Sequence, residues 1–155
     1  MHIRTYSDTD IPTMLSVIKA AFAEYQGQLD PPSSAERKTV AIVKAELAEA
    51  QALVAEADGY LVGCVFFRPQ AETIYIDRLA VLPTYRNRGI AGALLDAIEA
   101  RALSAGTTAL TLSVRLALKK QQAFYYKRGF AFQEYGTHPG YTAPTYMKMR
   151  KQLSL

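Results

Sequence analysis

A short basic segment, Arg86-Asn87-Arg88-Gly89, is the part of the sequence best suited to bind a charged ligand. It follows an apolar segment predicted as a strand and precedes a predicted helix that begins at Gly89. The first turn of a helix leaves backbone N–H groups unpaired and carries the positive end of the helix dipole. Arginine adds forked donors, and glycine lets the backbone approach a ligand closely. The segment therefore favours phosphate binding, with a solvated basic turn as the alternative.

The segment lacks both common glycine-rich phosphate motifs, GK[ST] and G-x-G-x-x-G. It resembles instead the acetyl-CoA signature of the GNAT N-acetyltransferase superfamily, a Gln/Arg-x-x-Gly-x-Gly/Ala pattern after a strand. Arg86-x-x-Gly89-x-Ala91 matches this pattern, and Leu79-Ala80-Val81-x-Pro83 precedes it. Downstream, Phe124-Tyr125-x-x-x-Gly129-Phe130 resembles the second motif of the family, a tyrosine-bearing helix followed by Gly-Phe. The resemblance covers about residues 73–132.

The resemblance implies that acetyl-CoA is the cosubstrate and that its acetyl group passes directly to a primary amine of a small molecule or peptide. It implies that backbone amides of the basic segment hold the pyrophosphate and that the preceding strand pairs with the pantetheine arm. A backbone N–H of that strand would polarise the thioester carbonyl. The implied cofactor-binding residues are Leu79, Ala80, Val81, Arg86, Arg88, Gly89, Ile90 and Ala91.

Tyr125 occupies the position at which the family usually places the general acid that protonates the departing thiolate. A tyrosine, with a pKa near ~10, can donate a proton or a hydrogen bond to a thiolate of pKa ~8.5. The alternative is that Tyr125 is a packed aromatic residue of an amphipathic helix. Tyr126 is adjacent, but it points elsewhere on a helix and is the weaker candidate.

Asp77 is the candidate for the group that receives the proton of the acceptor amine. It precedes Leu79 by two residues, so both side chains point to the same face of the predicted strand. An ion pair of Asp77 with Arg78, or with another surface cation, is the alternative. Glu72 and Glu134 are further candidates, and ordered water could replace a dedicated base.

The sequence departs from the family at Leu118, where the helix of the second motif often begins with an asparagine. This change leaves a non-catalytic sensor of CoA or acyl-CoA, built on the same fold, as an alternative function. Lys119 or Lys120 could replace the lost contact through a phosphate, although both could equally lie on a solvated face. His138, in a predicted late loop, is another candidate base, but a loop histidine is more often solvated.

The predicted elements follow the order β-α-α-β-β-β-α-β-α-β-β. The predicted strands are 2–6, 51–55, 60–67, 73–82, 109–114, 130–135 and 145–150; the two best-defined helices are 89–105 and 118–128. Segment 73–114 is a βαβ unit, which requires a parallel strand pair. We therefore expect an α/β fold with a mixed, mostly antiparallel sheet and helices on both faces. The 155 residues are half apolar, which predicts one GNAT-like domain over residues 1–155.

Two finer predictions concern the first half of the chain. Val40, Val43 and Leu47 are spaced to form the inner face of the second helix. Ser33 or Ser34 could cap that helix at its start. Cys64 lies in an apolar strand and is predicted to be a core residue.

Charge divides unevenly along the chain. Residues 1–77 carry 6 Lys/Arg and 11 Asp/Glu, whereas residues 78–155 carry 12 Lys/Arg and 3 Asp/Glu. The basic half indicates an anionic partner, and we expect CoA rather than nucleic acid because no nucleic-acid-binding motif is present.

One cysteine and two histidines argue against a metal site. We expect no membrane partner, because the longest apolar run, 60–67, is too short to span a bilayer. We expect a cytoplasmic location, because residues 1–8 lack the apolar region of a secretory signal and the single cysteine cannot form an internal disulfide. The resemblance is compatible with a homodimer.

Overall fold

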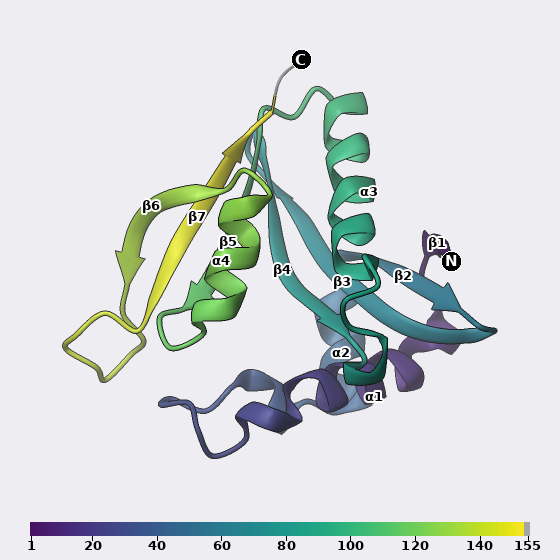
Figure 1. Cartoon of the computed structure of the whole chain (residues 1–155), viewed down its shortest axis with the longest axis horizontal. Helices are drawn as coiled ribbons and strands as arrows, with labels where there is room; N and C mark the ends of the chain where they lie inside the picture. Colours follow the sequence, from purple (N-terminus) through teal and green to yellow (C-terminus); the bar gives the residue numbers. More distant parts are fainter. Residues whose placement is uncertain (154–155) are drawn as a thin grey trace. The chain divides into compact units, whose positions relative to one another are not determined.

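The computed structural model describes residues 1–153, which form two compact units. The first unit comprises Met1–Arg68 and Arg78–Ile98, and the second comprises Pro69–Asp77 and the chain from Glu99 onward. The strands, labelled in Figure 1, are β1 (His2–Thr5), β2 (Gln51–Ala57), β3 (Tyr60–Gln70), β4 (Thr73–Val81), β5 (Ala109–Arg115), β6 (Ala131–Gly136) and β7 (Tyr146–Gln152). The α-helices are α1 (Ile11–Phe22), α2 (Val40–Leu47), α3 (Ile90–Ser104) and α4 (Lys119–Lys127). Short 3-10 helices are η1 (Asp8–Asp10), η2 (Ala23–Tyr25), η3 (Ser34–Arg37) and η4 (Pro83–Tyr85).

The order of strands and α-helices confirms the predicted α/β architecture. The strand order in the sheet is β1-β2-β3-β4-β5-β7-β6. β4 pairs with β5 in parallel, whereas β1–β2, β2–β3, β5–β7 and β6–β7 are antiparallel. The parallel pair is the one predicted from the βαβ unit, since α3 connects its two strands. The sheet is therefore mixed and mostly antiparallel.

In the first unit, α1 and α2 cover one face of β2 and β3. The register pairs Val54 with Cys64, and both side chains are fully buried on this face. Met14 and Ile18 of α1 belong to the same core cluster, together with Val43 of α2. Cys64 is thus a core residue, as predicted, and burial raises the pKa of its thiol to about 12.

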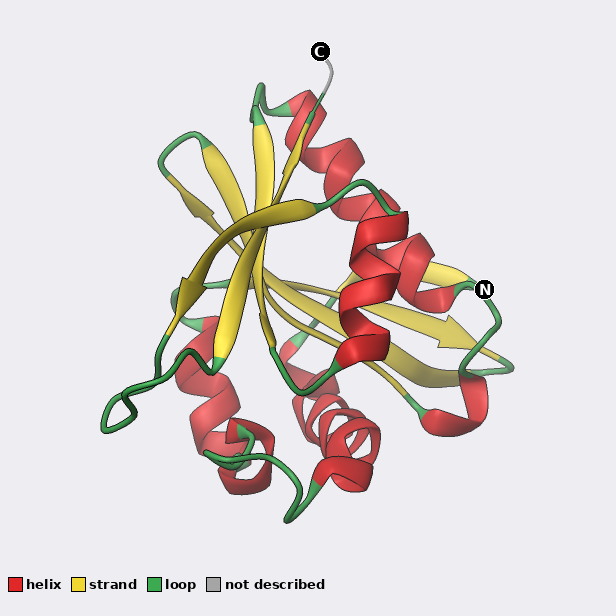
Figure 2. Ribbon diagram, turned by 60° about the vertical axis from the view of Figure 1, so that its left-hand side comes forward, coloured by secondary structure: helices red, strands yellow, loops and turns green. Residues whose placement is uncertain are grey.

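The first turns of α3 lie on the opposite face of these strands. A Cβ atom built on Gly63 of β3 would lie 3.2 Å from the Ile90 Cγ2 atom and 3.4 Å from the Leu94 Cδ1 atom. It would also lie 3.2 Å from the Ala80 carbonyl oxygen. The absent side chain at Gly63 is therefore what allows α3 to approach the strand. Within the first unit, helices therefore lie on both faces of these strands, as predicted (Figure 2).

In the second unit, β5 lies between the first half of β4 and β7. Its parallel register with β4 runs from Thr73–Ala109 to Ile76–Leu112. Toward β7, Leu112 pairs with Met149 and Val114 pairs with Met147, and these four side chains are buried. The alternation of buried and partly exposed residues in β5 is the pattern expected of a strand with one face packed.

The start of α2 differs from the prediction. Ser33 accepts a hydrogen bond from the Ala35 N–H and so caps η3 rather than α2. An extended residue at Lys38 separates η3 from α2, and Thr39 caps α2 instead. Because α2 begins later than predicted, Val40 lies in its first turn and is 39% exposed, whereas Val43 and Leu47 are buried. The prediction of Val40 as an inner-face residue is therefore wrong.

Several strands are longer than the sequence predicted. β2 and β3 remain paired up to Ala57 and Tyr60, so the hairpin continues to its turn. β7 extends to Gln152, which pairs with Ala109. Backbone pairing, rather than the type of side chain, extends these strands. Within residues 1–153, no helix is long and apolar enough to cross a membrane.

Candidate active site

The loop between β4 and α3 holds three of the eight predicted cofactor-binding residues, Arg86, Arg88 and Gly89. Pro83 begins η4, which ends the strand region, and the Arg86 N–H donates to the Pro83 carbonyl. Asn87 (φ 63°) and Gly89 (φ 79°) both adopt the left-handed backbone conformation. Glycine adopts this conformation without strain, and asparagine tolerates it better than most residues. The two left-handed residues change the direction of the chain, which then enters α3.

The start of α3 presents backbone donors at the end of this loop. The helix begins at Ile90 and has 15 residues. Its first turn carries N–H groups, including those of Ile90 and Ala91, that have no acceptor within the helix. Ile90 is buried in the core of the first unit, whereas Gly89 is exposed. The helix start is thus fixed by packing on one side and open on the other.

Arg88 has the more available guanidinium of the two arginines in the loop. Its side chain is 57% exposed. The Cζ atom lies 4.6 Å from the centroid of the Tyr85 ring, a cation–π contact. The Nη1 atom lies 3.9 Å from the Oδ2 atom of Asp58, to which the Tyr85 hydroxyl donates a hydrogen bond of 3.1 Å. A weak, exposed ion pair of this kind leaves Arg88 able to bind an anion.

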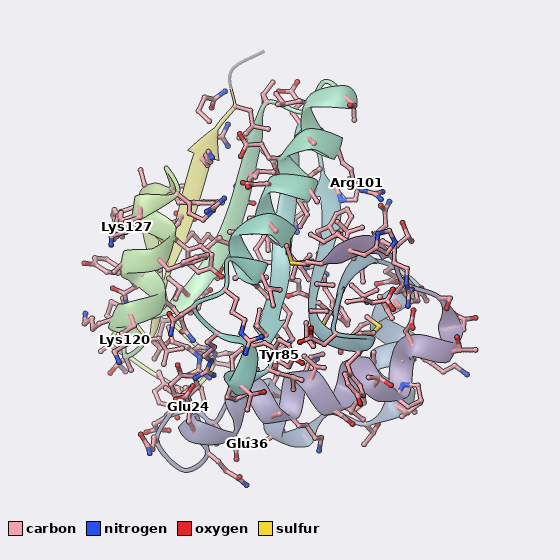
Figure 3. All side chains as sticks on the ribbon, turned by 45° about the vertical axis from the view of Figure 1, so that its right-hand side comes forward. Glu24, Glu36, Tyr85, Arg101, Lys120 and Lys127 are labelled. Atoms are coloured by element: carbon pink, nitrogen blue, oxygen red, sulfur yellow. The ribbon has the colours of Figure 1, made fainter. Side chains whose placement is uncertain are left out.

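Arg86 is held by contacts with α1 and η2 that the sequence did not reveal. Its Nη2 atom donates to the Ala21 carbonyl at 3.0 Å and lies 2.6 Å from the Oε1 atom of Glu24. Figure 3 labels Glu24 and Tyr85 in this part of the first unit. The guanidinium of Arg86 therefore fastens the loop to the end of α1. We expected it to contact the cofactor directly.

The end of β4 carries the other predicted cofactor-binding residues. Ala80 is buried in the core, and Leu79 and Val81 are half-buried and point to the opposite face by strand alternation. The register of β4 with β5 ends at Ile76, so these three residues lie beyond it. The Leu82 N–H donates to the Val62 carbonyl at 2.8 Å and connects the strand end to β3.

Asp77 is exposed at the end of the parallel register. Alternation places it on the same strand face as Leu79, as predicted, and Arg78 on the other face. Arg78 donates to the Ser34 hydroxyl and its Cζ atom lies 5.1 Å from the centroid of the Phe22 ring. Arg78 thus makes these contacts from the strand face opposite Asp77.

Tyr125 lies in α4 of the second unit and is half-buried. Its ring makes edge contacts with Phe124 and Phe130, at centroid distances of 5.3 and 5.7 Å. Burial raises the pKa of its hydroxyl to about 12, so the group is protonated at neutral pH. The residue is packed and also retains a proton to donate, whereas Tyr126 is exposed.

The comparison with protein families decides the identity of this chain. Residues 16–130 match the model of the acetyltransferase (GNAT) family. The chain belongs to the acetyltransferase (GNAT) family. Both sequence motifs lie within or at the end of the matched segment.

Individual relatives agree with this assignment. The chain is 38% identical, over 93 residues, to an IAA acetyltransferase from Azospirillum brasilense. The aligned segment covers 56% of this chain and 61% of the relative. The chain thus spans less than two thirds of the length of that curated relative. Its fold is similar to that of the PaiA N-acetyltransferase from Thermoplasma acidophilum in complex with coenzyme A (TM-score 0.82, 23% identity, 98% of each chain covered). It is also similar to the ribosomal-protein-S18-alanine N-acetyltransferase from Escherichia coli (TM-score 0.77, 18% identity, 99% and 94% covered).

The first turn of α4 in this GNAT protein has no side-chain cap but is held to the end of β5 by a glutamine. The N-cap residue is Leu118, whose apolar side chain supplies no cap. One turn later, the buried Gln122 donates from Nε2 to the carbonyls of Arg115 and Leu116, each at 2.9 Å. Sequence reasoning missed Gln122, although glutamine at an inward-facing helix position was an available signal. Lys120 and Lys127, labelled in Figure 3, lie exposed on this helix.

Two of the other candidate bases of this GNAT protein, Glu134 and His138, have side-chain partners of their own. Glu134 lies 3.4 Å from the Nζ atom of Lys148. His138 is half-buried rather than solvated, and its Nδ1 atom is hydrogen-bonded to the Thr145 hydroxyl. Burial, followed by the charge of Arg115, lowers the pKa of His138.

Proposed function

We propose that this GNAT protein transfers an acetyl group from acetyl-CoA to a primary amine of a small molecule or peptide, and that residues 1–155 act as one domain. The observation that carries the proposal is the β4–α3 loop. It combines a left-handed Gly89, the exposed Arg88 and the open start of a 15-residue helix. Backbone donors, a helix dipole and an exposed cation together suit a pyrophosphate.

The chain's own groups fit the remainder of acetyl-CoA. The N–H groups of residues 88–91 would donate to the pyrophosphate, with Arg88 adding charge. The β4 segment Leu79–Val81 lies beyond the β5 register, so its backbone groups would pair with the pantetheine amides. An N–H at Ala80 or Val81 would hold the negative charge that develops on the thioester oxygen.

Proton transfers at Asp77 and Tyr125 complete the reaction. Asp77 would orient the acceptor ammonium and take one proton from it before attack, directly or through water, a role supported by its exposed carboxylate. The neutral nitrogen then forms a bond to the acetyl carbon as the carbon–sulfur bond breaks. Tyr125 would donate its proton to the departing sulfur, a role supported by its protonated state at neutral pH. The second proton that the nitrogen loses as the amide forms would return to the Tyr125 phenolate through water.

A CoA-sensing module without catalysis is the second candidate. The observation that favours it is the replacement of the usual asparagine by Leu118, with Gln122 committed to the end of β5. In this case cofactor binding remains and turnover is lost.

The two candidates are separated by binding and turnover measured on the same sample. Acetyl-CoA at ~100 times Kd should stabilise the protein by about 2.7 kcal/mol and raise Tm by roughly 5–10 °C. Release of free thiol is then followed with polyamines, aminoglycosides, amino acids and peptides as acceptors. A rise in Tm with thiol release supports the enzyme, and a rise without release from any amine supports the sensor. A folded protein with no rise in Tm contradicts both.

A further inference from the structure

We propose that Asp58 is a positioning residue for the cofactor loop and acts on it through Tyr85 and Arg88. This inference rests on the proposed binding of acetyl-CoA by that loop. Asp58 lies at the turn between β2 and β3, far from the cofactor signature in sequence. Its Oδ2 atom accepts the Tyr85 hydroxyl at 3.1 Å and lies 3.9 Å from the Arg88 Nη1 atom. One carboxylate oxygen therefore contacts two residues of the loop.

The hairpin holds this carboxylate in a defined place. Ala57 pairs with Tyr60, so the turn contains only two residues, Asp58 and Gly59. Both have a positive φ, 54° and 81°, as a type I′ turn requires. This turn follows the twist of the strands and fixes their register. Asp58 is thus presented to the loop from a paired, ordered hairpin.

The two contacts of Asp58 have opposite effects on cofactor binding. The hydrogen bond to Tyr85 fixes the end of η4 and so favours the bound form of the loop. The ion pair holds Arg88 away from a phosphate and adds a negative charge beside it. The side chains of Asp58 and Arg88 are 68% and 57% exposed, so the pair is weak and a phosphate can displace it. Tyr85 would stay in place as Arg88 turns to the phosphate.

Two substitutions separate these effects. Asp58→Asn removes the charge but keeps a side-chain oxygen that can accept from Tyr85, and Asn-Gly suits the same turn. We expect Kd for CoA and KM for acetyl-CoA to fall about two- to fivefold, with kcat unchanged. Tyr85→Phe keeps the ring beneath Arg88 but loses the hydroxyl. We expect Kd for CoA to rise by a similar factor.

Arg88→Gln supplies the decisive comparison. If Asp58 acts through Arg88, Asp58→Asn has little effect on the Kd for CoA in the Arg88→Gln background. An equal effect in both backgrounds overturns the proposal, as does an unchanged Kd in Asp58→Asn. Glu49→Gln, an exposed carboxylate after α2, is the matched control and should leave the Kd unchanged.

Trypsin cleavage measured without CoA tests the role of Asp58 and Tyr85 independently of the proposed function. Trypsin cleaves after Arg86 and Arg88, and cleavage requires local opening of the loop. We expect Tyr85→Phe to be cleaved there several times faster than the wild type in the absence of CoA. Equal cleavage rates contradict the positioning role. Failure of the wild type to bind CoA contradicts the proposed function instead.

Discussion

The guanidinium of Arg86 donates a hydrogen bond of 3.0 Å to the main-chain carbonyl of Ala21, at the last turn of α1. The two residues are 65 positions apart in the chain. Glu24 adds an ion pair of 2.6 Å to the same guanidinium. A residue of the cofactor signature therefore joins the cofactor loop to the helical part of the first unit.

Loss of this contact should lower the stability of the protein. Arg86→Met removes the hydrogen bond and the partly exposed ion pair, and we expect the free energy of unfolding to fall by about 1 kcal/mol. Urea unfolding measures the change. Arg37→Met, at an exposed arginine of η3, is the control and should remain within about 0.5 kcal/mol of the wild type. If the two variants are equally stable, the Arg86–Ala21 contact contributes nothing in solution.

Gly89 and Gly106 provide a matched pair of left-handed glycines at opposite ends of α3. Their φ angles are 79° and 74°, and a Cβ atom at either would meet no described atom within 4 Å. Alanine at either position should cost roughly 1–2 kcal/mol of stability through backbone strain. Only Gly89→Ala should also weaken binding of acetyl-CoA, by about tenfold or more, since its methyl group would lie beside the backbone donors. Calorimetric titration of both variants tests this, and equal affinities would remove Gly89 from the binding site.

Tyr125→Phe tests the proton donor. The substitution keeps the ring contacts with Phe124 and Phe130, so we expect the fold and the Kd for acetyl-CoA to be retained. Loss of general-acid catalysis should lower kcat by about tenfold or more. Tyr126→Phe, at an exposed tyrosine of the same helix, should leave kcat at the wild-type value. Wild-type turnover in Tyr125→Phe would reduce Tyr125 to a packing residue.

Asp10 should give the protein a defined sensitivity to acid. Hydrogen bonds from Arg4 lower the pKa of this carboxyl to about 2 from an ordinary value of 3.8. Because the folded pKa is the lower one, Asp10 stabilises the fold above pH 3.8, and this contribution disappears as the pH falls toward 2. The pair is partly exposed, so we expect about 1 kcal/mol.

The measurement is the free energy of unfolding as a function of pH. Asp10→Asn should flatten the curve between pH ~4 and ~2, because it removes the group that titrates there. Asp8→Asn, an exposed carboxylate of the same short helix, should keep the wild-type slope. Parallel curves for Asp10→Asn and the wild type would contradict the assignment.

Sequence patterns were sufficient for the order of the elements because each strand and helix has its own periodicity. Val43 and Leu47 of α2 were predicted from their helical spacing, and both are buried. The ends of the elements were predicted less well, because they depend on the strand or capping residue that each end pairs with. Thr39 rather than Ser33 caps α2, and only the extended residue at Lys38 explains why.

The candidate site was predicted in its local parts and missed in its distant contacts. The turn at Gly89 is readable from the residue type and from its place before a helix. The partners of Arg86 and Tyr85 lie tens of residues away, on α1 and on the β2–β3 turn. No local pattern shows that Arg86 would be held by main-chain and carboxylate oxygens rather than by a phosphate.

The close approach of Gly63 to Ile90 has a consequence for the evolution of this chain. Any side chain at position 63 would press on the γ-branch of Ile90 and on the Ala80 carbonyl. Ile90 is the first residue of α3, directly after the cofactor loop, so a displacement of Ile90 would shift the backbone N–H groups proposed to bind the phosphates. Among related sequences, a residue larger than glycine at position 63 should therefore occur together with an unbranched residue at position 90. Selection for ligand binding would then appear as covariation between positions 63 and 90, which are both buried and contact no ligand themselves.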